Sequence, residues 1–287
     1  MTSTPTYEST SVNETIDDLD IHYHTAGTGP ALLLLHGSGP GVSAWSNFGD
    51  NIGFFAEHFQ VFMPDLPGFG DSALPELTEV YTVAAARVIL RLMDHLQLSS
   101  AVFIGNSMGG AVVAEIAALA PERVERMAIM GSGGLSVSIF QTEPSDGFTR
   151  LFAFLENPGR DRMVEWLHTM VYDKSLVTEE LIETRMRNAT APGVLERTRA
   201  IFGAMFNPEL RKTYTPLWTR AETITTPTLM LWGRDDRMLP YDQAHFANRW
   251  LPEIELHTFA HCGHWVQIER KRDFERVALE FLTRHTA

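Results

Sequence analysis

The chain has 287 residues, of which 44% are hydrophobic and 21% are charged, a composition typical of a globular protein. The net charge of -13 disfavours binding to nucleic acid or to anionic membranes, and it would repel an anionic substrate unless a local cation compensates. The single cysteine, Cys262, excludes an intrachain disulfide. No segment resembles a signal peptide or a membrane span, so we expect a cytoplasmic protein.

Apolar runs alternate with helical patterns over much of the chain. Residues 1 to about 14 are rich in Ser and Thr and are expected to be loosely ordered. The strands are predicted, in chain order, over residues 21–24, 31–35, 60–63, 101–104, 127–130, 228–232 and 254–259. Helices are predicted over about 80–96, 110–120 and 272–284. This alternation predicts an α/β fold with a mostly parallel, doubly wound sheet.

The strand signal disappears between about Leu135 and Ala221. What remains are helical patches rich in Met, Phe and Trp, separated by prolines. We therefore predict a helical cap over residues 135–221, inserted into a core domain that residues 1–134 and 222–287 form together.

A candidate nucleophile lies in the stretch Gly105-Asn106-Ser107-Met108-Gly109, which has the form G-x-S-x-G. A buried strand is predicted before it and a buried helix after it. In that context the glycines allow a sharp turn that presents the serine hydroxyl above the sheet, with the first N–H groups of the helix beside it. We predict that Ser107 is a nucleophile.

A serine nucleophile needs a base that is oriented by an acid. His261 and His264 follow the last predicted strand, and Asp235 and Asp236 follow the strand over 228–232. The carboxyl ends of parallel strands meet at one edge of a sheet. The residues alone leave both choices open, but the chain order Ser, Asp, His is that of the α/β-hydrolases.

The glycine-rich stretch His36-Gly37-Ser38-Gly39-Pro40-Gly41 also follows a predicted strand. It is similar to the loop that supplies half of an oxyanion hole, so the expected donors are the backbone N–H groups of Ser38 and Met108. Asp65 lies in a glycine-rich turn and is interpreted as structural. His22 and His24 share a strand face without a third ligand at a recognisable spacing, and His36 stands alone. No metal site is therefore predicted.

One arginine lies on the apolar face of a predicted cap helix. Thr178 can cap this helix, and Leu181, Ile182, Met186 and Ala189 form its apolar stripe. Arg185 falls inside the stripe, where a guanidinium needs a partner. It could extend its charge to solvent or form a structural ion pair, or it could bind a substrate carboxylate in a bidentate manner. Helix geometry does not distinguish these interpretations.

Together these residues resemble the meta-cleavage product hydrolases, the C–C bond hydrolases of aromatic and steroid ring degradation within the α/β-hydrolase superfamily. The resemblance covers most of the chain. Its segments are residues 36–41 with Trp45-Ser46-Asn47, residues 105–110, residues 170–174 with the helix through Arg185, residues 232–237, and Cys262-Gly263-His264-Trp265.

The resemblance implies an α/β-hydrolase fold with an inserted cap and assigns roles to residues. It makes Asp236 the acid and His264 the base of a triad with Ser107. It places Arg185, Asn106, Asn47, Gly37 and Trp265 at or beside the substrate. One departure is Ser38, where the family often has glycine. The N–H group survives this change, but the hydroxymethyl group narrows or polarises the entrance.

The implied substrates are 2-hydroxy-6-oxo-hexa-2,4-dienoates, small anionic molecules that carry a variable group on C6. Cleavage of the C5–C6 bond would give 2-hydroxypenta-2,4-dienoate and a carboxylic acid without a cofactor, by an acyl-enzyme or by direct attack of water through a gem-diol. The C6 group is left open, and a homo-oligomer (dimer or higher) is expected. Two alternatives are a carboxylesterase with the same triad and a receptor-like protein that binds its ligand without turnover.

Overall fold

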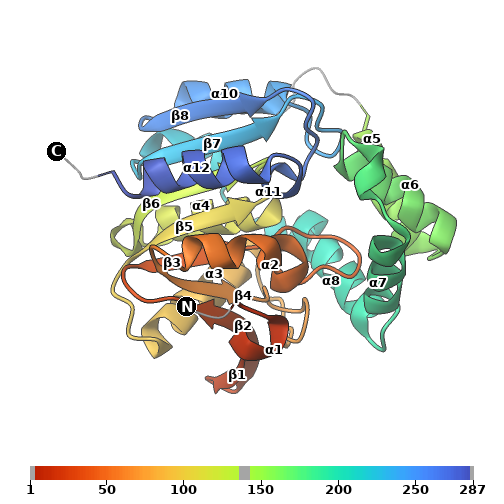
Figure 1. Cartoon of the computed structure of the whole chain (residues 1–287), viewed down its shortest axis with the longest axis horizontal. Coiled ribbons are helices and arrows are strands. Elements are labelled where there is room, and N and C mark those ends of the chain that lie inside the picture. The colour runs from red at the N-terminus through yellow and green to blue at the C-terminus, as the bar shows by residue number, and fades with distance from the viewer. Residues whose placement is uncertain (1–3, 136–142, 285–287) are drawn as a thin grey trace.

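The computed structural model describes residues 4–135 and 143–284. In this part of the chain a single sheet has the strand order β1-β2-β4-β3-β5-β6-β7-β8 (Figure 1). The strands are β1 Ser11–Ile16, β2 Leu19–Ala26, β3 Ala31–Leu35, β4 Gln60–Pro64, β5 Ala101–Asn106, β6 Val124–Met130, β7 Thr228–Gly233 and β8 Ile254–Phe259. The pairs β1–β2 and β2–β4 are antiparallel, and the other neighbours are parallel. Every predicted strand lies within one of these strands.

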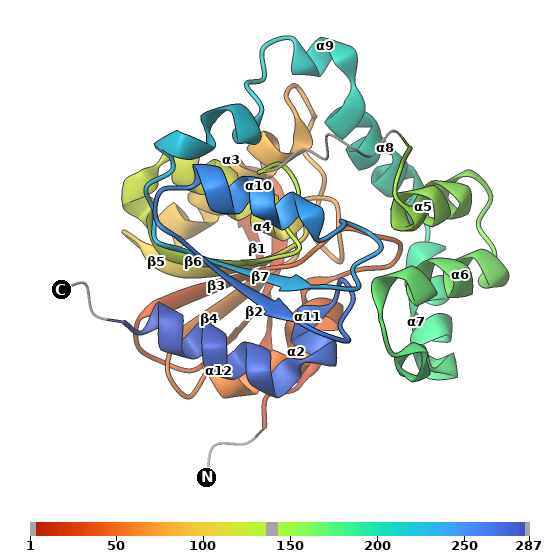
Figure 2. The ribbon, with the colours of Figure 1, turned by 90° about the horizontal axis from the view of Figure 1, so that it is seen from above.

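Helices cover both faces of the sheet (Figure 2). The helices α2, α11 and α12 lie on one face, and α3, α4 and α10 lie on the other. Their bounds are α2 Ala44–Phe55, α3 Tyr81–His95, α4 Met108–Leu119, α10 Asp242–Trp250, α11 Val266–Glu269 and α12 Lys271–Leu282. Strand β3 explains the uninterrupted apolar run, because Leu33 and Leu35 pack into the core of one face and Leu32 and Leu34 into the core of the other.

In the chain, the helical insert comes between β6 and β7. Its helices α5 to α8 stand beside the carboxyl ends of the parallel strands (Figures 1 and 2). Its elements are α5 Asp146–Glu156, α6 Arg160–Met170, η2 Lys174–Leu176, α7 Glu179–Ala189, α8 Val194–Phe206, α9 Pro208–Arg211 and η3 Leu217–Thr223. The predicted start of the cap adjoins residues 136–142, which lie outside the described residues, and its predicted end falls within η3. The boundaries of the cap therefore stay a prediction.

The prediction of a loose N-terminal segment is wrong for the residues that the structure describes. Helix α1 spans Tyr7–Thr10, and β1 pairs antiparallel with β2 from Ser11↔His24 to Ile16↔Leu19. A capping box between Thr6 and Ser9 begins the helix. The Ser/Thr composition concealed this order because it comes from capping and from pairing with a distant strand. No helix within residues 4–135 and 143–284 is long and apolar enough to cross a membrane.

Candidate active site

Ser107 occupies the turn between β5 and α4. Its backbone has φ 54° and ψ -115°, a conformation that L-residues rarely adopt. The turn tolerates no side chain at the positions two residues before and two residues after the serine. A Cβ on Gly109 would lie 2.1 Å from the carbonyl oxygen of Leu35, and one on Gly105 would lie 2.7 Å from Cα of Gly110. The G-x-S-x-G pattern is therefore a steric requirement of the turn, which points the first N–H groups of α4 toward the space above Ser107.

The loop after β8, residues 260–265, contains His264 and is called the base loop. It meets the loop after β7 beside this turn. Nδ1 of His264 lies 2.7 Å from Oδ2 of Asp236, and both side chains are buried. The other carboxylate oxygen of Asp236 accepts the N–H groups of Met238 and Leu239, each at 2.8 Å. These bonds fix the carboxylate and place the proton of a neutral His264 on Nδ1. Nε2 of His264 is buried without a hydrogen-bond partner and is therefore free to accept a proton.

The two neighbours that the residues alone left as alternatives have other surroundings. Oδ2 of Asp235 accepts the N–H group of Cys262 at 3.3 Å, so this carboxylate supports the base loop. His261 is exposed, has a positive φ of 53°, and packs its ring 5.2 Å from that of Tyr172. The geometry therefore favours Asp236 and His264 over their two neighbours, and their triad with Ser107 stays a prediction.

The candidate oxyanion loop packs directly on the serine turn. A Cβ on Gly37 would lie 2.9 Å from Oδ1 of Asn106 and 3.2 Å from Cβ of Ser107. This contact brings the backbone around Ser38 close to the serine. Met108 is the first residue of α4, so its N–H group has no acceptor within the helix. The arrangement suits the two predicted N–H donors, whose roles stay a prediction.

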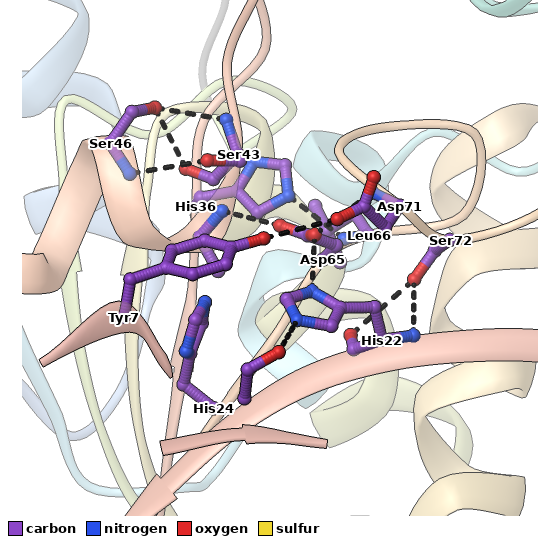
Figure 3. Close-up of polar contacts among 12 residues, drawn as sticks. Tyr7, His22, His24, His36, Ser43, Ser46, Asp65, Leu66, Asp71 and Ser72 are labelled. Atoms are coloured by element: carbon purple, nitrogen blue, oxygen red, sulfur yellow. Dashed lines mark hydrogen bonds and ion pairs between the residues drawn. The ribbon is translucent and has the colours of Figure 1, made fainter. Parts of the chain in front are cut away.

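His36, which the sequence presented only as an isolated candidate metal ligand, has two backbone hydrogen-bond partners. Its Nδ1 donates to the carbonyl oxygen of Gly37 at 2.6 Å. Its Nε2 accepts the N–H group of Leu66 at 2.8 Å (Figure 3). The bond from Leu66 requires an unprotonated Nε2 and hence the neutral ring, and burial lowers the pKa of His36 accordingly. His36 therefore ties the candidate oxyanion loop to the loop that follows β4. The sequence offered only the position of His36 at the head of the glycine-rich loop as a signal for this role.

Asp65 is the centre of a buried polar network beneath that loop (Figure 3). Oδ1 accepts the N–H group of Ala44 at 2.6 Å, and Oδ2 accepts Nδ1 of His22 at 2.7 Å and the N–H group of Asp71 at 3.1 Å. Burial alone would raise the pKa of Asp65, but these donors outweigh it and the net direction is downward. The network agrees with the structural interpretation of Asp65.

The same network contains a group with metal-ligand chemistry. Ligand atoms of His22, Asp65 and Asp71 all lie within 4.8 Å of one another. However, Nδ1 of His22 is bonded to Asp65, and its Nε2 lies 2.8 Å from the hydroxyl of Ser11. A metal ion would have to displace these bonds, so the geometry fits a hydrogen-bond network better than a metal centre. The absence of a metal site stays a prediction.

Arg185 lies on α7 with 2% of its surface exposed. Within the described residues it forms no ion pair: Nη1 donates to the carbonyl oxygen of Pro40 at 3.4 Å, and Nε is buried without a partner. Its guanidinium lies 5.4 Å from the ring centroid of Trp265. Burial lowers the pKa of Arg185 to about 10, which leaves it charged at neutral pH. A buried cation without an acid partner argues against both structural interpretations that the sequence allowed.

Asn47 and Asn106 form a second polar pair. Nδ2 of Asn47 lies 3.4 Å from Oδ1 of Asn106, both side chains are buried, and Oδ1 of Asn47 has no partner. Asn106 directly precedes Ser107, so this pair borders the serine turn.

A cavity of about 240 Å³ reaches Ser107 from the side of the helical insert. Ser38, Ser107 and Met108 are part of its lining. Most of the remaining wall is apolar and includes Phe148, Phe202, Met205, Phe206, Leu217 and Met238. Asn47, Asn106 and Arg185 are not in the described lining. The serine therefore lies between two regions, an apolar cavity on one side and a group of buried polar side chains on the other.

Comparison with known proteins identifies the family. Residues 30–271 match the family described as alpha/beta hydrolase fold. A 2-hydroxy-6-oxo-6-phenylhexa-2,4-dienoate hydrolase from Burkholderia cepacia is 35% identical, with 98% of each chain covered. A 2-hydroxy-6-oxononadienedioate/2-hydroxy-6-oxononatrienedioate hydrolase from Burkholderia vietnamiensis is 37% identical, covering 99% of this chain and 98% of the relative.

The chain belongs to the meta-cleavage product hydrolases. Among solved structures, the phenylhexadienoate hydrolase of Rhodococcus sp. strain RHA1 superimposes with a TM-score of 0.84 at 31% identity, covering 94% of this chain and 98% of that one. The meta-cleavage product hydrolase of Pseudomonas fluorescens IP01 gives the same TM-score at 30% identity, covering 95% and 97%. The family and fold predictions are thereby confirmed.

Proposed function

We propose that this meta-cleavage product hydrolase cleaves the C5–C6 bond of 2-hydroxy-6-oxo-hexa-2,4-dienoates. Family membership supports the reaction type. The observation that carries the proposal is the buried guanidinium of Arg185, which forms no ion pair within the described residues. A buried cation is costly unless something anionic joins it. The carboxylate of the dienoate supplies that anion and overcomes, locally, the repulsion of a chain with net charge -13.

Ser107, His264 and Asp236 carry the chemistry in this proposal. His264, oriented by Asp236, first assists tautomerisation of the dienol to a ketone, which creates an electron sink next to the bond that breaks. It then removes the proton of Ser107, whose Oγ attacks the C6 carbonyl. The N–H groups of Ser38 and Met108 stabilise the oxyanion, and each such donor contributes on the order of 3 kcal/mol to the transition state.

Cleavage of the C5–C6 bond and hydrolysis of the acyl-enzyme complete the cycle. The C5–C6 electron pair passes to the dienoate fragment, which takes a proton and leaves as 2-hydroxypenta-2,4-dienoate. Water, deprotonated by His264, hydrolyses the acyl-enzyme, releases the carboxylic acid and restores Ser107. The net reaction consumes one water and needs no cofactor.

The cavity wall favours an uncharged, bulky group on C6. The wall is mostly apolar and aromatic, and the one arginine in its described lining, Arg211, is exposed, donates to the carbonyl oxygen of Met205 and lies 5.9 Å from the ring centroid of Tyr214. A second carboxylate on the substrate would therefore be desolvated at a cost of several kcal/mol without a dedicated partner. We infer a preference for an aryl group over an acidic side chain.

The experiment is a kcat/KM panel for wild type and Ser107→Ala. Dienoates with methyl, isopropyl, phenyl and carboxyethyl groups on C6 are compared with 4-nitrophenyl esters. The proposal expects phenyl to exceed carboxyethyl, and Ser107→Ala to lose activity toward all dienoates. Undiminished turnover by Ser107→Ala would overturn the nucleophile assignment. Ester turnover without dienoate turnover would favour the carboxylesterase, and binding without turnover would favour the receptor.

A further inference from the structure

Glu269 is the last residue of α11 and lies five positions after His264. Its carboxylate accepts three backbone N–H groups. Oε1 accepts that of Gly263 at 2.6 Å, and Oε2 accepts those of Tyr172 and Asp173 at 2.7 and 3.1 Å. Gly263 directly precedes His264, whereas Tyr172 and Asp173 follow α6 in the helical insert. One partly buried carboxylate thus joins the base loop to a turn of the insert.

Backbone hydrogen bonds also join the same two segments directly, in addition to the contacts of Glu269. The carbonyl oxygen of Met170 accepts the N–H groups of His264 at 2.8 Å and of Trp265 at 3.3 Å. A Cβ on Gly263 would lie 2.8 Å from that oxygen and 2.9 Å from Cα of Val171, so only glycine allows this approach. The peptide that carries the candidate base is therefore held on both sides, by Met170 and by Glu269.

Three N–H groups and one cation surround the Glu269 carboxylate at the contact between the base loop and the insert. Burial raises the pKa of Glu269 overall, and the three N–H donors and the nearby Lys174 offset only part of this shift. Lys174 itself is held by the carbonyl oxygens of His168 and Val171 on the same turn. Loss of the carboxylate would leave three N–H groups without their acceptor, and the two segments could then separate.

We propose that Glu269 is a positioning residue: it holds the base loop against the turn after α6, so that His264 stands correctly over Ser107 only when the insert is seated. The proposal rests on the proposed function, because it assumes that His264 is the base. It adds a residue that touches neither substrate nor reacting atoms. A displacement of about 1 Å at a reacting group can cost about 100-fold in rate.

The test compares Glu269→Gln and Glu269→Asp with Glu275→Gln as a matched control. Glu275 is also a buried carboxylate, bonded to Asn51 and Lys271, but it lies on α12 and no described hydrogen bond joins it to the base loop. The amide of Glu269→Gln turns an N–H group toward N–H donors. We expect its kcat for the phenyl dienoate to fall about 10- to 100-fold while KM changes less than about twofold.

Glu269→Asp keeps the charge on a shorter side chain and should regain part of kcat. Glu275→Gln should lower Tm without lowering kcat. All assays are made well below the Tm of each variant. A wild-type kcat in both Glu269 variants, with only Tm lowered, would overturn the positioning role. If Ser107→Ala keeps full turnover, the proposed function fails instead, so the two failures are distinguishable.

Discussion

The guanidinium of Arg185 lies 5.4 Å from the ring centroid of Trp265, the residue that follows His264. A cation from the helical insert thus stacks on the base loop of the core. Glu269 joins the same two parts of the chain through backbone N–H groups. We therefore expect that anion binding at Arg185 and the positioning of His264 both depend on the contact between the helical insert and the base loop.

The first prediction concerns Arg185→Ala. The buried partner of the substrate carboxylate would be lost, which costs about 2–5 kcal/mol for a desolvated charge pair. We expect kcat/KM for the phenyl dienoate to fall at least about 30-fold. Hydrolysis of a neutral 4-nitrophenyl ester should change little, because it presents no carboxylate. Steady-state kinetics with both substrates provide the measurement.

Arg187→Ala is the matched control for this prediction. Arg187 lies on the same helix but is exposed, and its guanidinium bonds only to Thr184 among the contacts described. It should keep wild-type kinetics toward both substrates. Equal losses of dienoate and ester activity in Arg185→Ala would contradict the carboxylate role and indicate a structural one.

The second prediction separates the two aspartates that follow β7. Asp236→Asn should lower kcat by about 10³–10⁴, because an amide can present N–H to Nδ1 and select the wrong tautomer of His264. Asp235→Asn should keep kcat within about twofold, since its side-chain oxygen can still accept the N–H group of Cys262. Comparable losses in the two variants would refute the assignment of Asp236 as the acid.

Local sequence patterns predicted those parts of the fold whose conformation is determined by residues close together in the chain. The apolar run of β3, the G-x-S-x-G turn and the capped helix through Arg185 each follow from the neighbouring residues. The choice of His264 over His261 came from the resemblance. In the structure, this choice is supported by the hydrogen bond between His264 and Asp236, which are 28 positions apart in the chain.

The residues that the sequence missed act over long distances in the chain. His36 bonds to Leu66, and Glu269 bonds to Tyr172 and Asp173, 97 and 96 positions away. No periodicity encodes such contacts. A glutamate five residues after a candidate base looks like an ordinary solvated side chain until the insert is packed against it.

The third prediction concerns stability in mild acid. His24 is fully buried, and burial, together with the charge of nearby His22, lowers its pKa to about 4. Between pH 4 and the unfolded value of about 6.5, the unfolded chain binds the proton and the folded chain does not. The free energy of unfolding therefore falls as pH falls through this window. The pKa of His22 is raised, so the stability that its protonated form contributes is fully present below about pH 6.5. His22 therefore does not make the free energy of unfolding depend on pH in this window.

The measurement is urea unfolding of wild type and His24→Phe at pH 5 and pH 7. Whatever its absolute stability, the variant should lose about 1–2 kcal/mol less than wild type between pH 7 and pH 5. The exposed His58→Gln serves as the control and should keep the wild-type difference. An unchanged difference in His24→Phe would show that His24 does not resist protonation in the folded state.

The last prediction concerns Glu115, which lies fully buried on α4, the helix that Ser107 precedes. Its carboxylate accepts the hydroxyl of Tyr214 at 2.7 Å and pairs with Arg220 at 2.5 Å. Tyr214 lines the cavity that reaches Ser107. Glu115→Gln leaves Arg220 without its counter-charge, so we expect the free energy of unfolding to fall by about 2–3 kcal/mol.

The same substitution should also change substrate selection. The single amide oxygen of Glu115→Gln cannot accept from both Arg220 and Tyr214. With this oxygen turned toward Arg220, Tyr214 loses its acceptor and can move, so KM should rise for the phenyl dienoate more than for the methyl dienoate, which occupies less of the cavity. The exposed Glu222→Gln on η3 should alter neither stability nor KM. If Glu115→Gln lowers stability but raises both KM values equally, Glu115 supports the fold without shaping the C6 cavity. If stability is unchanged, the ion pair does not fasten the end of the helical insert to α4.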